Sequence, residues 1–279
     1  MTPAEAAEAI IEDLGITEVG ELDVEAIAFD AGVEVVYEEL SGCEATLVGV
    51  GDLAIATINP SSYRGRARFS VAHEVGHWTL HKGRSFRCRG DQVEENFAST
   101  SELEKEADTF ASHLLMPARM FNEAILPFGK PNFKQLADVA SSFQTSLTAT
   151  ALRLVGVDTL PAIIACYNRN GLRWHVAAKH VPRRWYLKDQ VDDDSFTYDL
   201  LFSGKECRTL GKQAADTWFT NDDAGRYEVL EQCVPLRGDE VLVLIYLTDA
   251  KMMYAGFDPG VGNRRYNERG SYVAPRGAH

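Results

Sequence analysis

The chain has 279 residues, of which 45% are hydrophobic and 25% are charged, a composition typical of a globular protein with one large or two smaller domains. A net charge of −13 argues against a dedicated nucleic-acid binder, because Lys and Arg supply most phosphate contacts. No apolar run reaches the length of about 18 residues that a membrane span requires, and the acidic N-terminus does not resemble a signal peptide. Five cysteines without C-x-x-C spacing indicate reduced thiols, so a cytoplasmic location is expected.

The first part of the chain combines short helices with a hairpin. Helical spacing of apolar residues predicts a helix over 3–14, and Asp23 is typical of the N-cap of a second helix over 24–31. Strands are predicted over 33–37, 45–50 and 53–58. The last strand, read as the outer one and ending at Asn59, is expected to hydrogen-bond an extended peptide substrate.

The stretch 66–82 carries the strongest chemical pattern in the chain. Read as a helix, it places His73 and His77 four residues apart on one face, where two imidazoles can share one metal ion. Glu74 lies beside them, in position to take a proton from metal-bound water. The rest of the stretch is mostly apolar, and polar groups in a buried helix need a reason because unpaired ones are costly. The alternative is a chance match with core histidines that are satisfied by hydrogen bonds.

A later helix, predicted over 103–116, supplies matching carboxylates. Glu104 and Asp108 lie four residues apart on its alanine-rich face. His73, His77 and Glu104 therefore form the three-ligand set of a catalytic zinc site, with a fourth position for water. Asp108 is placed to accept a hydrogen bond from the outer N–H of a ligand histidine. A solvated helix face is the alternative for the two carboxylates.

Three nearby polar residues receive other interpretations. Glu106 is a competing ligand, but at 100° per residue it points roughly 200° away from Glu104, which is preferred. His81 stands about 12 Å from His73 along the helix axis, too far to share one ion, and is read as a helix-end histidine. His113 lies on the face of its helix opposite Glu104 and is interpreted as structural.

These motifs, in this order, resemble the ImmA/IrrE family of bacterial metallo-endopeptidases, which are zinc peptidases of the gluzincin type. The similarity covers residues 1–156. Its stretches are Asp23-Val-Glu-Ala-Ile-Ala, Ile58-Asn59, Arg68-Phe-Ser-Val-Ala-His-Glu-Val-Gly-His-Trp-Thr-Leu-His81, Glu104-Lys-Glu-Ala-Asp-Thr-Phe-Ala-Ser-His-Leu-Leu-Met-Pro117 and Ser146 through Leu154. The resemblance implies that His73, His77 and Glu104 bind the metal and that Glu74 is the catalytic base. It allows Mn²⁺ as well as Zn²⁺, although two imidazoles and a carboxylate suit Zn²⁺ best.

The resemblance also implies a kind of substrate. Members of this family typically cleave a partner protein, often a helix-turn-helix transcriptional repressor or an antitoxin, in a stress or mobile-element response. A membrane partner and direct DNA binding are not expected.

Residues 132–156 have a helix-turn-helix outline, with helical runs on both sides of Gln144-Thr-Ser146. The second run opens with Leu147-Thr-Ala-Thr-Ala151, which offers little for reading base edges, so this segment is expected to pack on the metal-binding part. Beyond Pro161 the sequence predicts antiparallel strand pairs around Asn168–Gly171 and Arg237–Asp239, with 251–257 as a possible further strand.

The predicted fold class is α+β. A zincin-like metallopeptidase domain with a small antiparallel sheet is expected over 1–130, and a helix-turn-helix-like segment over 131–158. A C-terminal α+β domain with an antiparallel sheet and a sensor or substrate-docking role is expected over 159–279. The predicted function is a metal-dependent endopeptidase. Two alternatives stay open: a DNA-binding regulator with a structural metal site, and a sensor or binding protein with a vestigial one.

Overall fold

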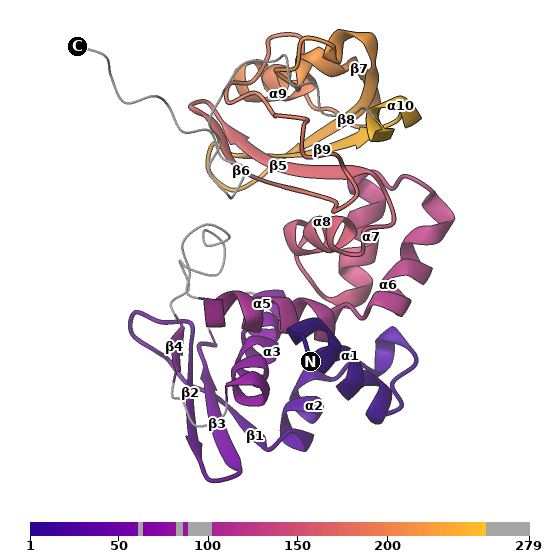
Figure 1. Ribbon diagram of the computed structural model, residues 1–279. Coiled ribbons are helices and arrows are strands. Elements are labelled where there is room, and N and C mark those ends of the chain that lie inside the picture. The colour runs from indigo at the N-terminus through magenta and orange to yellow at the C-terminus, as the bar shows by residue number, and fades with distance from the viewer. Residues whose placement is uncertain (61–63, 82–85, 89–101, 255–279) are drawn as a thin grey trace, which may run out of the picture. The chain divides into compact units, whose positions relative to one another are not determined.

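A computed structural model describes residues 1–60, 64–81, 86–88 and 102–254 (Figure 1). The chain divides into two compact units, residues 1–157 and residues 158–279. Within the described ranges, every helix is too short or too polar to span a bilayer.

Helices make up most of the first unit. They are α1 Pro3–Asp13, α2 Val24–Asp30, α3 Arg64–Leu80, α5 Glu102–Leu115, α6 Ala118–Ile125, α7 Phe133–Phe143 and α8 Leu147–Gly156, with 3-10 turns at Val19–Glu21 and Leu126–Phe128. Asp23 caps α2 as predicted, because its side chain accepts hydrogen bonds from the backbone N–H groups of Glu25 and Ala26. α6 is an addition to the predicted elements. It begins directly after Pro117, which cannot continue α5 and occupies the N-cap position of α6.

A four-stranded sheet belongs to the same unit. Its strands are β1 Val33–Tyr37, β2 Ala45–Val50, β3 Leu53–Ile58 and β4 Phe86–Cys88, in the order β1-β3-β2-β4. The three predicted strands are present, and Gly51, with a φ of +64°, forms the turn of the β2–β3 hairpin. The sheet is mixed rather than purely antiparallel, because β1 and β3 run parallel. β3 lies between β1 and β2 in the sheet and pairs with both of them.

One face of this sheet is buried against α3, and the other is exposed. Leu47, Ala56 and Ile58 point to the buried face, whereas Val50 on the opposite face is 80% exposed. A Cβ atom at Gly49 would overlap the indole ring of Trp78 from α3, so the missing side chain is what lets the ring lie against β2.

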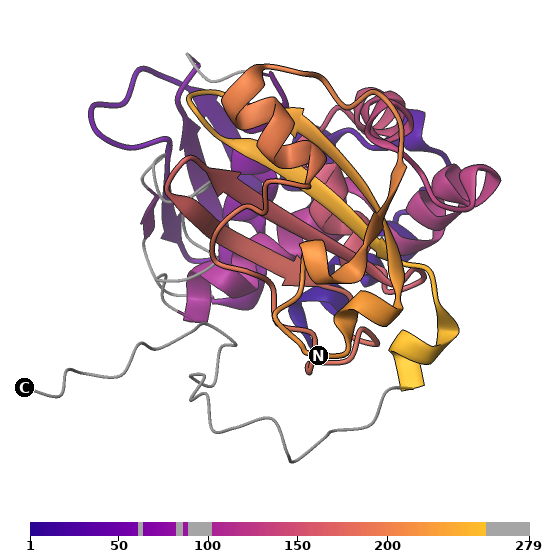
Figure 2. The same cartoon turned by 90° about the horizontal axis from the view of Figure 1, so that it is seen from above.

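The second unit is built on a five-stranded sheet. Its strands are β5 Ala162–Asn168, β6 Gly171–Ala177, β7 Gly211–Ala214, β8 Glu228–Pro235 and β9 Val241–Leu247, in the order β6-β5-β9-β8-β7. All neighbours are antiparallel, and the two predicted strand pairs are present. The central strand β9 is buried at every residue. The helix α9 Phe196–Ser203 packs on β8 and β9 and crosses the sheet in Figure 2.

The strand expected over 251–257 is not present in its described part. Residues there belong to a short helix, α10 Ala250–Tyr254, and those from 255 onward lie outside the described residues. The 3-10 turns of this unit are Ala215–Thr217 and Ala224–Arg226.

Candidate metal centre

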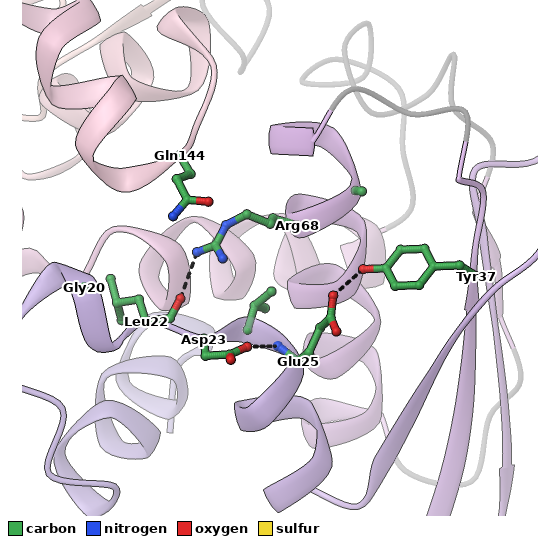
Figure 3. Close-up of a pocket in the computed structure, with 9 residues that line it drawn as sticks. Gly20, Leu22, Asp23, Glu25, Tyr37, Arg68 and Gln144 are labelled. Carbon is green, nitrogen blue, oxygen red and sulfur yellow. Dashed lines mark hydrogen bonds between the residues drawn. The ribbon is translucent and has the colours of Figure 1, made fainter.

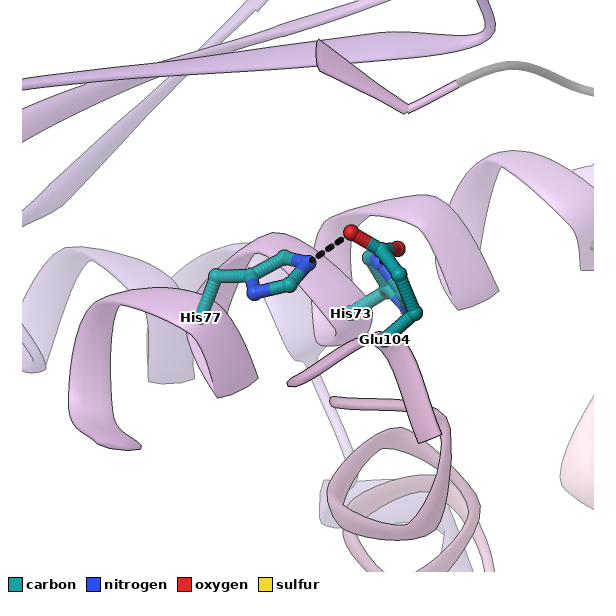
Figure 4. A group of neighbouring side chains, drawn as sticks. All are labelled: His73, His77 and Glu104. Atoms are coloured by element: carbon teal, nitrogen blue, oxygen red, sulfur yellow. Dashed lines mark ion pairs between the residues drawn. The ribbon is translucent and has the colours of Figure 1, made fainter. Parts of the chain in front are cut away.

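The 17-residue helix α3 carries His73 and His77 on one buried face. The centroids of the two imidazole rings are 4.6 Å apart, and the ring planes are close to perpendicular. In Figure 4 both rings lie on the same side of α3, toward the carboxylate of Glu104. The i, i+4 pair predicted from the sequence is therefore present in the interior of the first unit.

The helix α5 places Glu104 opposite this pair. One carboxylate oxygen, Oε2, lies 3.2 Å from His73 Nε2, and the other, Oε1, lies 3.5 Å from His77 Nε2. One ligand atom from each of the three residues lies within 4.8 Å of the others. Two imidazole nitrogens and a carboxylate oxygen are the donor types of zinc sites with three protein ligands. The structure thus brings the three predicted ligands together.

The protonation states of these groups suit a cation. Burial opposes ionisation of Glu104, but hydrogen bonds from His73 and His77 outweigh it and keep the pKa of Glu104 well below its usual range. Burial lowers the pKa of His77 below its ordinary value, even though Glu104 favours the charged ring. An ionised carboxylate and a neutral imidazole are the forms in which these groups bind metal. The donor set therefore fits a divalent ion.

The outer nitrogens of both histidines also have polar neighbours. Asp108 Oδ1 lies 2.9 Å from His73 Nδ1, at the position predicted from its spacing to Glu104. His77 Nδ1 lies 3.1 Å from His81 Nδ1, and His81 Nε2 lies 2.8 Å from Glu106 Oε2. The sequence interpretation of His81 as a helix-end histidine, and of Glu106 as a competing ligand that points away from Glu104, misses this contact. The available signal was the continuation of the i, i+4 spacing from His77 to His81.

Glu74, the predicted base, is fully buried in α3 next to His73. A carboxylate is rarely retained in such a position without a specific polar environment, since burying a charge is costly. Its catalytic role stays a prediction.

Asn59 follows β3, and the structure changes the reading of this strand. β3 pairs with β1 on one side and with β2 on the other, so its backbone groups are engaged within the sheet. The expectation that β3 is an outer strand is therefore wrong, and the described edge strands are β1 and β4. The Asn59 side chain donates a hydrogen bond to the Leu40 carbonyl at 3.2 Å.

A separate cavity of about 360 Å³ lies at the starts of α2 and α3 (Figure 3). Arg68 Nη2 donates a hydrogen bond to the Leu22 carbonyl at 3.0 Å, and the Tyr37 hydroxyl donates one to Glu25 at 2.6 Å. Burial and the Glu25 carboxylate raise the pKa of Tyr37 to about 12, so the phenol keeps its proton. The predicted site residues do not line this cavity.

Residues 29–155 match the family described as "IrrE N-terminal-like domain", peptidase family M78. The matched region contains α3 and α5, and with them all three members of the buried cluster. We call residues 1–157, the unit that contains the matched region, the M78 domain. The match over residues 29–155 shows similarity to the M78 peptidase family. It agrees with the resemblance to the ImmA/IrrE family that the motifs suggest.

Comparison with solved structures shows a similarity of fold over most of the chain. No curated protein matches the chain. Among 11 matching solved chains, one is described as a "Mycobacterium tuberculosis transcriptional regulator". It is 14% identical, with a TM-score of 0.56 over 88% of this chain and 75% of that chain. At this level of identity the similarity concerns the fold alone.

The M78 domain also contains a partly buried polar network away from the cluster. His113 Nδ1 lies 2.9 Å from Glu8 Oε1, and Arg153 Nη1 lies 2.8 Å from His113 Nε2. Arg153 Nε donates a hydrogen bond to the Met116 carbonyl at 2.8 Å. These contacts link α1, α5 and α8. His113 thus takes part in packing contacts between helices, as its predicted position on α5 implies.

Proposed function

We propose that the M78 domain is a metal-dependent endopeptidase that hydrolyses a peptide bond in a partner protein. The observation that supports this proposal is the convergence of His73, His77 and Glu104 in a buried cluster, with Glu74 adjacent on α3. Zn²⁺ is the expected ion, and Mn²⁺ is the alternative. The ion held by these three residues would act as a Lewis acid toward the peptide carbonyl and the attacking water.

The remaining steps fall to the side chains of the domain. The Glu74 carboxylate accepts a proton from the attacking water and delivers it to the leaving nitrogen, which is the usual task of a general acid–base residue. Asp108 accepts a hydrogen bond from His73 Nδ1 and so orients the opposite nitrogen, Nε2, toward Glu104 and the ion. Asn59 is proposed to contact the substrate near the end of β3.

The proposed substrate is a basic protein, such as a helix-turn-helix transcriptional repressor or an antitoxin. Residues 1–60 contain no lysine or arginine, so the carboxylates on α1, α2 and β1 attract a cationic partner. The proposed setting is a bacterial stress or mobile-element response in the cytoplasm, where the free cysteines stay reduced. The unit beyond residue 158 would then serve as a sensor or docking domain.

A regulator with a structural or vestigial metal site is the second candidate. It is favoured by the description of the similar solved structure as a transcriptional regulator. The helices α7 and α8 give it a helix-turn-helix outline. However, the one cationic residue of α8, Arg153, is buried and donates to the Met116 carbonyl, so it is not available to a phosphate. This contact supports the peptidase over the DNA-binding alternative.

Metal content tests the proposal first. The full chain, incubated with Zn²⁺ or Mn²⁺ and desalted, is expected to retain about one ion by elemental analysis, as a three-ligand site does. Glu104→Ala should lose most of it. Absence of metal from the wild type after this treatment would overturn the proposal.

Cleavage tests the chemistry. New N-termini in a bacterial lysate are expected with the metal-loaded wild type, and Glu74→Gln should reduce their rate of appearance by about 10²–10⁴-fold while keeping the ion. Metal binding together with equal cleavage by both proteins would assign Glu74 no catalytic role.

A further inference from the structure

The outer nitrogen of His77 faces a second histidine instead of a carboxylate. His77 Nδ1 and His81 Nδ1 are 3.1 Å apart, and His81 Nε2 is 2.8 Å from Glu106 Oε2. The side chain of His81 is only 6% exposed, while that of Glu106 is 41% exposed. These three residues form a chain that starts at the surface of α5 and ends at the buried cluster, and we call it the His77–His81–Glu106 chain.

The proposed direction of the hydrogen bonds along this chain takes the Glu106 carboxylate as an acceptor and His81 as a neutral imidazole. An ionised carboxylate can only accept, so His81 Nε2 carries the proton that faces Glu106. A neutral His81 then offers Nδ1 as an acceptor, and the proton between the two rings must belong to His77 Nδ1. His77 Nε2 is left with its lone pair, and this atom is the one that faces Glu104. Glu106 thus selects, through His81, the form of His77 that can bind a cation.

The two predicted histidine ligands differ in this respect. His73 Nδ1 contacts the Asp108 carboxylate directly, at 2.9 Å. His77 Nδ1 instead contacts another imidazole, whose position depends on the last turn of α3 and which in turn contacts Glu106. Loss of that imidazole should therefore affect His77 and leave the His73–Asp108 contact in place.

We propose that His81 and Glu106 are positioning residues, which hold His77 in the Nδ1-protonated form with Nε2 directed at the metal. This inference rests on the proposed metal-dependent function and adds two residues to its site. Both act through His77, since neither belongs to the cluster of His73, His77 and Glu104.

Metal affinity of the full-length protein provides the first test. Zn²⁺ binding is measured by competition with a chromophoric chelator for the wild type, His81→Leu, His81→Gln and Glu106→Gln. His81→Leu should weaken binding by about 10–100-fold, the usual effect of removing the outer partner of a ligand histidine. His81→Gln should retain more affinity, because its side-chain oxygen can still accept from His77 Nδ1. Glu102→Gln removes an exposed carboxylate from the same helix and controls for the loss of charge alone.

The tautomer of His77 provides a readout that a merely structural role would not change. In ¹⁵N NMR spectra of the metal-free wild type, His77 should show a protonated Nδ1 and an unprotonated Nε2. His81→Leu should shift His77 toward the other tautomer, and His81→Gln should restore the wild-type pattern. This comparison holds even if His81→Leu proves too unstable for metal titration, because His81→Gln and Glu106→Gln can be compared by themselves.

The outcomes separate two failures. A wild type that binds no Zn²⁺ overturns the proposed function and, with it, this inference. A wild type that binds Zn²⁺ while all three variants match it in affinity and in the His77 tautomer overturns the inference alone. Equal losses in Glu102→Gln and Glu106→Gln would assign the effect to net charge and also contradict the positioning role.

Discussion

Replacing Arg153 with methionine tests whether the partly buried polar network keeps three helices of the M78 domain together. The arginine donates to the Met116 carbonyl at 2.8 Å and contacts His113 at 2.8 Å and Glu8 at 3.4 Å. Methionine fills much of the same volume but has no donor. Breaking a buried ion pair costs about 3–5 kcal/mol. The Glu8 side chain is 28% exposed, and it still accepts hydrogen bonds from His113 and from the Ala118 N–H, both at 2.9 Å. We therefore expect a smaller loss of unfolding free energy, about 2–3 kcal/mol.

Urea unfolding followed by ¹⁹F NMR of 5-fluorotryptophan measures this loss in the right unit. Trp78 is the single tryptophan of residues 1–157, so its signal reports the unfolding of that unit. Arg119→Met is the matched control, because Arg119 pairs with Glu123 at 3.7 Å on the surface and its side chain is 61% exposed. The control should change stability by less than about 0.5 kcal/mol. Similar small losses for both variants would refute the reasoning that the network supports the domain.

Two further outcomes are expected. Gly49→Ala should lower the stability of the first unit by about 1–3 kcal/mol, because the new Cβ would displace the Trp78 ring from β2. Gly20→Ala has open space and is the control, so equal effects in the ¹⁹F assay would contradict this reading. In the second unit, burial raises the pKa of Glu231, against hydrogen bonds from Thr197 and Trp218. The protonated form of Glu231 therefore stabilises the fold fully below the ordinary pKa of 4.5, and this contribution is lost as the pH rises through the folded-state pKa. Glu231→Gln should remove this loss, so that the melting temperature depends less on pH above pH 4.5 than it does in the wild type. If the melting temperature of Glu231→Gln depends on pH as that of the wild type does, titration of Glu231 does not contribute to the stability.

The sequence predicts the site well where one local rule decides the geometry. Spacing of four residues places two side chains on one face of a helix, and this rule alone pairs His73 with His77 and Glu104 with Asp108. The hairpin turn at Gly51 and the N-cap at Asp23 are equally local. In each case, the residues that decide the outcome lie within a few positions of one another.

The features that the sequence does not reveal depend on packing between distant elements. The parallel pairing of β1 with β3 depends on which strand of the β2–β3 hairpin lies next to β1. The spacing of strands along the sequence does not determine this choice. The contact of His81 with Glu106 depends on the rotation of α3 against α5 and on the path of a long side chain. The angular position of Glu106 on its helix correctly excludes it from the ligand cluster. It does not show which residue of another helix Glu106 contacts.

The close approach of α3 to α5 depends on a residue without functional chemistry. Gly76 lies between His73 and His77 in α3, and a Cβ at this position would come within 3.0 Å of the Phe110 ring of α5. Such a contact is tighter than close packing tolerates, so the two helices would have to separate or Phe110 would have to move. Glu104 lies on α5 only 3.2 and 3.5 Å from the two Nε2 atoms, and a small shift of α5 would separate it from both. The geometry of the candidate ligands therefore also depends on Gly76, because donor atoms on two helices can converge only when the helices approach closely.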